Sequence, residues 1–311
     1  MAIVKPNQLD FSNKKVNMII AGVAGIGKTT LALSSPKPLL IDLDGGIGRV
    51  EAIYRKDCMM CENYNELEKD LKENDLRDYE TIVIDTGGKL LEMLKEKVIS
   101  DNPKNGKSDG NLSLQGYGAV KREFSNFISM IKSLNKHLII IFHATEVKLK
   151  DDVTGLRIRM EGSSRDEVWD DIDIGGFVEM VGRERTIGFS NCERYYAKGT
   201  HSISGIMSIP RLEKGKPNTF ITDLFNNYLE ALNKETKELK DYQLLMDCFK
   251  AELEDVDSVE KYNELFKQMK TYKHVLTSEV EIKHIMKSKA KEMKLVYDKE
   301  RDLFSNAEPV K

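Results

Sequence analysis

Short apolar runs alternate with segments of helical spacing over the first half of the chain. The runs are VNMIIA (16–21), LLIDLD (39–44), TIVID (81–85) and LIIIF (138–142), and the helical segments cover about 64–76, 87–98 and 114–134. Runs this apolar are typical of strands that are buried on both faces. We therefore predict an α/β fold with a mainly parallel central sheet and helices on both of its faces.

The pattern changes twice after residue 143. Between about 144 and 222, short alternating pieces such as LRIRM, FVEMVG and RTIGFS predict an antiparallel β extension. From about 233 helical spacing returns alone, first at Leu239, Tyr242, Leu245, Phe249 and Leu253, and near the end at Ile282, Ile285, Met293 and Val296. We accordingly predict two domains, with residues 1–232 as the α/β domain and residues 233–311 as a C-terminal α-helical module.

A glycine-rich segment follows the first apolar run. It reads Gly22-Val23-Ala24-Gly25-Ile26-Gly27-Lys28-Thr29-Thr30 and matches the phosphate-loop pattern GxxxxGK followed by Ser or Thr, between a strand and a helix. Glycines let the backbone curl so that successive N–H groups point at phosphate oxygens. We predict that all nine residues bind a nucleotide, that Lys28 contacts its β- and γ-phosphates, and that the Thr29 hydroxyl is a ligand of Mg²⁺.

Four further polar residues lie at the end of a predicted strand or directly after it. Asp85 ends the TIVID run and is the expected Walker B carboxylate, a second ligand of Mg²⁺. Asp42 and Asp44 lie two residues apart, and so are expected on the same side of a strand; either could orient the attacking water, and we favour Asp44, although it could instead form the turn before Gly45. His143 directly follows LIIIF, where it is either a γ-phosphate sensor or a structural histidine.

Composition limits the classes of partner. The 311 residues include 48 Lys and Arg against 51 Asp and Glu, a formal net charge of −3, so any contact with nucleic acid must be local. Purely apolar stretches are far shorter than the ~20 residues that span a bilayer, and the first residues contain no apolar leader segment. We expect a cytoplasmic protein with no membrane partner.

These motifs, in this order and spacing, carry a resemblance to a known family. Over about residues 14–205, the phosphate loop, PLLIDLDGG, YETIVIDT, SLQGYGAVKREF and LIIIFHATEVK resemble the RecA-like ATPases encoded by phages, including the Sak single-strand annealing group. The resemblance implies a RecA-like P-loop core that binds ATP and Mg²⁺ and assembles into rings or filaments. It also implies action on single-stranded DNA alongside a single-strand binding protein, in the cytoplasm of a bacterial host.

Individual roles follow from the same resemblance. Lys28 and Thr29 match the Walker A pair and Asp85 the Walker B acid, whereas Asp44 stands where RecA-like proteins usually have a glutamate. His143 matches a polar sensor that leads into a DNA-binding loop. Lys198 resembles the lysine that such proteins project into a neighbouring subunit's nucleotide, although as a bare sequence feature it is more typical of a solvated strand end.

Two basic segments are candidates for DNA contact, because both are expected to follow strands on the nucleotide side of the sheet. They are residues 100–113, with Lys104 and Lys107, and residues 148–166, with Lys148, Lys150, Arg157 and Arg159; Tyr117 could stack on a base. Both segments also contain acids, so simple solvation is an equal alternative.

Two functions remain open. The first is an ATPase that acts on single-stranded DNA in recombination, annealing or replication. The second is a nucleotide-switched loader that delivers a helicase or a single-strand binding protein and hydrolyses little ATP itself.

Overall fold

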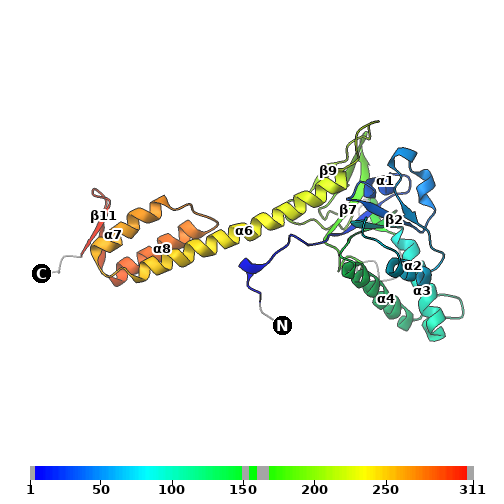
Figure 1. The fold of residues 1–311 in the computed structure, drawn as a ribbon, viewed down its shortest axis with the longest axis horizontal. Coiled ribbons are helices and arrows are strands. Elements are labelled where there is room, and N and C mark those ends of the chain that lie inside the picture. The colour runs from blue at the N-terminus through cyan, green and yellow to red at the C-terminus, as the bar shows by residue number, and fades with distance from the viewer. Residues whose placement is uncertain (1–3, 149–153, 160–167, 307–311) are drawn as a thin grey trace. The chain divides into compact units, whose positions relative to one another are not determined.

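The computed structural model describes residues 4–148, 154–159 and 168–306 (Figure 1). Lys150 and residues 160–166, which belong to one predicted DNA-contacting segment, lie outside these ranges. The chain divides into two compact units, one formed by Lys14–Leu229 and the other by Met1–Asn13 together with Glu230–Lys311. The predicted domain boundary at residues 232 and 233 falls inside one long helix, α6 (Phe220–Glu254).

The unit Lys14–Leu229 is built on a nine-stranded sheet of order β3-β2-β4-β5-β1-β7-β8-β9, with β6 paired to β5. The strands are β1 (Asn17–Gly22), β2 (Pro38–Asp42), β3 (Cys58–Met59), β4 (Thr81–Asp85), β5 (His137–Lys148), β6 (Thr154–Ile158), β7 (Ile174–Val181), β8 (Glu184–Gly188) and β9 (Ile206–Ser208). Strands β3, β2, β4, β5, β1 and β7 pair in parallel. β8, β9 and β6 are antiparallel to their neighbours, which confirms the predicted mixed sheet.

Helices cover the sheet where the apolar periodicity predicts them. They are α1 (Lys28–Ala32), α2 (Tyr64–Glu73), α3 (Gly87–Asp101) and α4 (Leu114–Ser133). Asn63, Thr86 and Ser113 cap the last three, because their side-chain oxygens accept the N–H groups of Glu66, Lys89 and Gly116. Apolar residues of α2, α3 and α4 share one buried core with β1, β2, β4 and β5. Every residue of β1, β2 and β4 is buried, as expected for central parallel strands.

The first turns of α6 form hydrogen bonds with Ser34, which follows the C-terminal end of α1. The Ser34 hydroxyl accepts the Ile221 N–H at 3.0 Å, and the Ser34 carbonyl accepts both the N–H and the hydroxyl of Thr222. Phe225 is fully buried and its ring stacks on His137 at the start of β5. The short helix that follows the glycine loop is therefore fixed at its C-terminal end.

The C-terminal unit has a core of its own. It contains residues 230–254 of α6, followed by α7 (Val259–Gln268), α8 (Ser278–Glu292) and a hairpin of β10 (Leu295–Asp298) and β11 (Leu303–Asn306). Its buried residues include Phe249, Tyr262, Ile282 and Met286. The prediction that Val296 is helical was wrong. The helical spacing of apolar residues continues beyond the end of α8, and Val296 lies in β10.

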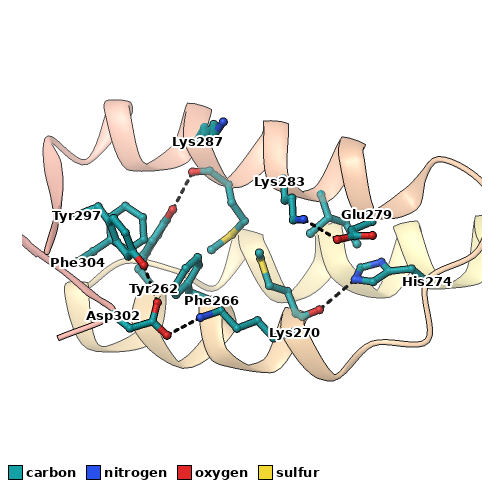
Figure 2. A pocket seen from close by; sticks show the side chains of 13 residues that line it. Tyr262, Phe266, Lys270, His274, Glu279, Lys283, Lys287, Tyr297, Asp302 and Phe304 are labelled. Atoms are coloured by element: carbon teal, nitrogen blue, oxygen red, sulfur yellow. Dashed lines mark hydrogen bonds and ion pairs between the residues drawn. The ribbon is translucent and has the colours of Figure 1, made fainter. Parts of the chain in front are cut away.

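α7, α8 and the β10–β11 hairpin line an open cavity of about 700 Å³ (Figure 2). Most of its lining is apolar, and the charged side chains at its edge form exposed ion pairs, Lys270 with Asp302 and Lys283 with Glu279. The Tyr262 hydroxyl donates to the Met286 carbonyl at 2.9 Å across the interior. The cavity thus has an apolar interior and a solvated, charged edge.

None of the helices in the described ranges combines the length and the apolar character that crossing a membrane requires.

Candidate active site

The strand register gathers the predicted residues at one edge of the sheet. Gly22 at the end of β1 lies beside His143 of β5, and Asp42 at the end of β2 lies beside Asp85 at the end of β4. All four strands run parallel, so their carboxyl ends meet. In open α/β sheets this edge is where ligands bind.

The glycine loop presents unused backbone donors. Gly25 and Gly27 have φ angles of 77° and 87°, in the left-handed region that glycine adopts without strain. Within the residues that the structure describes, the N–H groups of Gly25, Ile26 and Gly27 donate to no protein acceptor. Val23, Ala24 and Gly25 are exposed, while Thr30 is partly buried in α1. The loop is therefore an open cradle of N–H donors that suits an anion.

Gly22 is required by a close approach of the neighbouring strand. A Cβ atom at this position would lie only 2.8 Å from the carbonyl oxygen of Val178 in β7. β7 therefore packs directly against the start of the loop, which brings β8 within reach of the same site.

Lys28 is almost completely buried, with 5% of its surface exposed. Its Nζ donates to the Val23 carbonyl at 2.9 Å and lies 3.4 Å from Nδ1 of His143. Burial lowers the pKa of the Lys28 ammonium, and the carboxylates of Asp85 and Asp44 act in the opposite direction. The buried Lys28 ammonium contacts its own loop and lies where it can bind phosphate oxygens.

Thr29 and Asp85 form the candidate metal site. The Thr29 hydroxyl donates to Oδ2 of Asp85 at 2.6 Å. Burial raises the pKa of the Asp85 carboxyl and the Asp42 carboxylate adds to this, while the Thr29 hydrogen bond and Lys28 lower it. In the described ranges no group of three or more His, Cys, Asp or Glu side chains is arranged to hold a metal alone. This donor set fits Mg²⁺, which takes one or two protein oxygens together with substrate phosphates.

Asp42 and Asp44 have different surroundings. β2 ends at Asp42, so Asp44 lies in the bend beyond the strand and not, as expected, on one side of it with Asp42. Asp42 accepts the N–H groups of Gly46 and Ile47 at 2.7 and 2.9 Å, which fixes the turn. Asp44 accepts from Arg49 at 3.1 Å and lies 3.8 Å from Nε2 of His143. Of the two carboxylates, Asp44 is the more exposed, and it is the one that lies near His143.

His143 lies between the cation and this carboxylate. Burial lowers the pKa of its imidazole, the positive charge of Lys28 lowers it further, and Asp44 and Asp85 raise it. Its two ring nitrogens face Lys28 and Asp44 respectively. The imidazole thus lies between Lys28 and Asp44, the candidate water-orienting acid.

The structure places Lys198 away from this cluster of side chains. Its Nζ donates to the Trp169 carbonyl at 3.2 Å, and its backbone pairs with Gly175 at the start of β7. The ammonium thus has a hydrogen-bond partner within the same chain. A role in a neighbouring subunit's nucleotide site stays a prediction.

Two arginines at the site had no sequence signal. Arg49 pairs with Asp44, and Arg185 of β8 places its guanidinium against the glycine loop, with Nη1 3.4 Å from the Ile26 carbonyl. Arg185 follows Ile26 by 159 positions, and only the pairing of β1, β7 and β8 brings them together. Spacing along the chain could not reveal such a contact.

One family model matches the chain. It is described as an AAA domain and covers residues 14–201, which contain every residue of the site described above. No curated protein shows significant similarity to the chain.

Proposed function

Because the chain belongs to the AAA domain family, whose P-loop fold it has, we propose that it binds ATP with Mg²⁺ and hydrolyses it while acting on single-stranded DNA. The observation that supports this best is the buried Lys28 inside an open N–H cradle, beside the hydrogen-bonded pair of Thr29 and Asp85. The family supports nucleotide binding and ATPase activity, and the DNA substrate is our own step beyond it.

The roles of the side chains follow from their positions. Lys28 and the loop N–H groups bind the phosphates, and Thr29 with Asp85 would hold Mg²⁺, which neutralises charge on the phosphoryl oxygens when bound. Asp44 orients the attacking water, because Asp42 uses both its oxygens on the turn at Gly46 and Ile47. His143 senses the terminal phosphate, since it lies between Lys28 and Asp44.

Single-stranded DNA is proposed because a basic hairpin continues from the site. β5 runs past His143 to Lys148, β6 returns antiparallel to it, and the Arg159 N–H then donates to the His143 carbonyl at 2.7 Å. A DNA phosphate bound by Arg159 would therefore lie beside a residue that is hydrogen-bonded to His143, and Lys148 on the same hairpin would add a second contact with the phosphate backbone. The Arg157 guanidinium is less available, because it donates to the carbonyls of Leu156 and Arg194.

The other predicted DNA-contacting residues give weaker support. The segment 100–113 joins α3 to α4 and does not follow a strand, contrary to expectation, although Lys104 and Lys107 are exposed in it. Tyr117 packs partly against the core, so less of its ring is free to stack on a base. We therefore base the DNA proposal on the β5–β6 hairpin.

The test is ATP turnover by the full chain with Mg²⁺, alone, with a long single strand and with duplex DNA, across a salt series. We expect stimulation by the single strand that fades as salt rises, and loss of that stimulation in the double variant Lys148→Gln, Arg159→Gln. Lys214→Gln, at an exposed lysine of the same unit, is the matched control. Equal stimulation in the hairpin variant would contradict the assignment of the hairpin.

The alternative function is a nucleotide-switched loader for a helicase or a single-strand binding protein. The separate C-terminal unit favours it, because this unit has its own core and exposes Val280, Val296 and Tyr297. Bound nucleotide with slow turnover that no DNA accelerates is the result that would select this alternative. A ring or filament of several copies is compatible with both functions and is tested by light scattering with and without ATP.

A further inference from the structure

Arg185 lies on β8, and its side chain contacts the glycine loop. Its residue pairs with Met180 of β7, and its carbonyl accepts the Ile209 N–H at 2.8 Å. The guanidinium reaches the loop at Gly27, where a Cβ atom would lie 2.3 Å from its Nη1. The side chain is thus held against the phosphate cradle from a strand that carries no other residue of the site.

This guanidinium has a weak protein partner. Its one hydrogen bond in the described residues is the 3.4 Å contact with the Ile26 carbonyl, and no carboxylate in those residues forms an ion pair with it. The side chain is partly buried, and burial lowers the pKa of the guanidinium. A guanidinium has five N–H donors. When it is partly desolvated, it binds most strongly to an anion that accepts two of these N–H groups.

The strand order indicates which part of a bound nucleotide would lie near Arg185. Asp42, Asp85 and His143 lie on β2, β4 and β5, on one side of β1, whereas Arg185 lies on β8, on the other side. Thr29 and Asp85 would hold a metal ion that neutralises charge on the phosphates, so the γ-phosphate would lie on the side of the acids. The α-phosphate and the nucleoside of a nucleotide bound in this way would extend toward β7 and β8.

From this arrangement we infer that Arg185 is a nucleotide ligand that binds the α- and β-phosphates from the side opposite the catalytic acids. The inference rests on the proposed nucleotide site and adds to it a cation that the phosphate-loop motif does not contain. Arg185 serves binding of di- and triphosphates alike and is not a sensor of the γ-phosphate.

The experiment is equilibrium titration of ADP and ATP, each with Mg²⁺, into the full chain and into Arg185→Gln. We expect both nucleotides to bind about tenfold more weakly to the variant, with the ratio of the two affinities unchanged. Arg185→Lys retains the charge and is expected to recover part of the loss. Arg183→Gln, two residues earlier in the exposed turn between β7 and β8, is the matched control and should bind like the wild type.

Melting of the nucleotide-free proteins separates binding from support of the loop. The inference predicts that Arg185→Gln melts at or above the wild-type temperature, because a partly buried cation is removed. Unchanged affinities, a loss confined to ATP, or a lowered melting temperature that accounts for the weaker binding would each overturn it. If the wild type itself binds neither nucleotide, the proposed function fails, a result distinct from failure of the Arg185 assignment alone.

Discussion

The two compact units of this chain differ in whether their charged side chains are buried or exposed. In Lys14–Leu229, the side chains of Lys28, Asp42 and Asp85 are 4–5% exposed at one edge of the sheet. In the C-terminal unit, Lys270 and Lys283 remain exposed at the edge of an apolar cavity (Figure 2). Buried charges reduce stability unless partners compensate them, so a fold keeps them where a ligand will use them. We therefore place the proposed chemistry in the first unit, whereas the second is held together by packing.

The largest difference between the two units is expected at the proposed metal site. Asp85→Asn removes a negative oxygen beside Thr29 while keeping the shape, and we expect ATP turnover to fall about 10³-fold, equivalent to about 4 kcal/mol. Steady-state assays with Mg²⁺ measure this. Asp302→Asn, at the edge of the C-terminal cavity, is the control and should leave turnover unchanged. Comparable losses in both variants would show that charge has no special role in the first unit.

Packing in the C-terminal unit gives the next largest effect. Phe249 is fully buried in its core, so Phe249→Ala should lower the free energy of unfolding by about 3–5 kcal/mol. Phe266→Ala, at the open cavity, leaves a space that solvent already reaches and should cost less. Urea unfolding followed by circular dichroism compares the two. A larger loss for Phe266→Ala would mean that the cavity and not the core holds this unit together.

A buried histidine makes the first unit sensitive to acid. Burial lowers the pKa of His137 to about 4, Lys15 lowers it further, and Glu80 and Asp173 act in the opposite direction. Its Nδ1 accepts the Val16 N–H at 3.0 Å, so the neutral ring is the one that fits. The unfolded chain takes up the proton near pH 6.5 and the folded one does not. Stability is therefore full above pH 6.5 and falls by about 3 kcal/mol as the pH drops to 4.

Urea unfolding between pH 7 and pH 4 tests this in the wild type and in His137→Gln, which keeps a hydrogen-bond acceptor. The variant should lose less stability over this range, because carboxylates contribute to both proteins alike. Parallel curves for the two proteins would rule out His137 as the source.

The smallest effect belongs to the exposed pair of Lys283 and Glu279, whose side chains are both more than half exposed. Exposed helix pairs contribute little, because water screens them and ordering two side chains costs entropy. Glu279→Gln should shift the melting temperature by no more than about 2 °C. A larger shift in calorimetry would show that the edge of the cavity is structurally important.

The sequence predicts the parts of this molecule that depend on local pattern. Alternating apolar runs and helical segments predict the parallel sheet, and the glycine motif predicts an open loop before Lys28. The sequence does not predict that Arg49 and Arg185 lie at the site, because strand order and turn geometry bring them there. Val296 was wrongly assigned to a helix because it follows Met293 at helical spacing. That spacing alone does not show whether the second residue continues the helix or lies in a following strand.

The central claim is that the edge of the sheet around Lys28 is a nucleotide site, and calorimetric titration of ATP with Mg²⁺ into the full chain tests it most directly. We predict one ATP bound per chain, at least about 100-fold weaker binding to Lys28→Ala, and no change in Lys287→Ala, a lysine at the C-terminal cavity. Absence of ATP binding to the wild type, or equal affinity in Lys28→Ala, would contradict the claim.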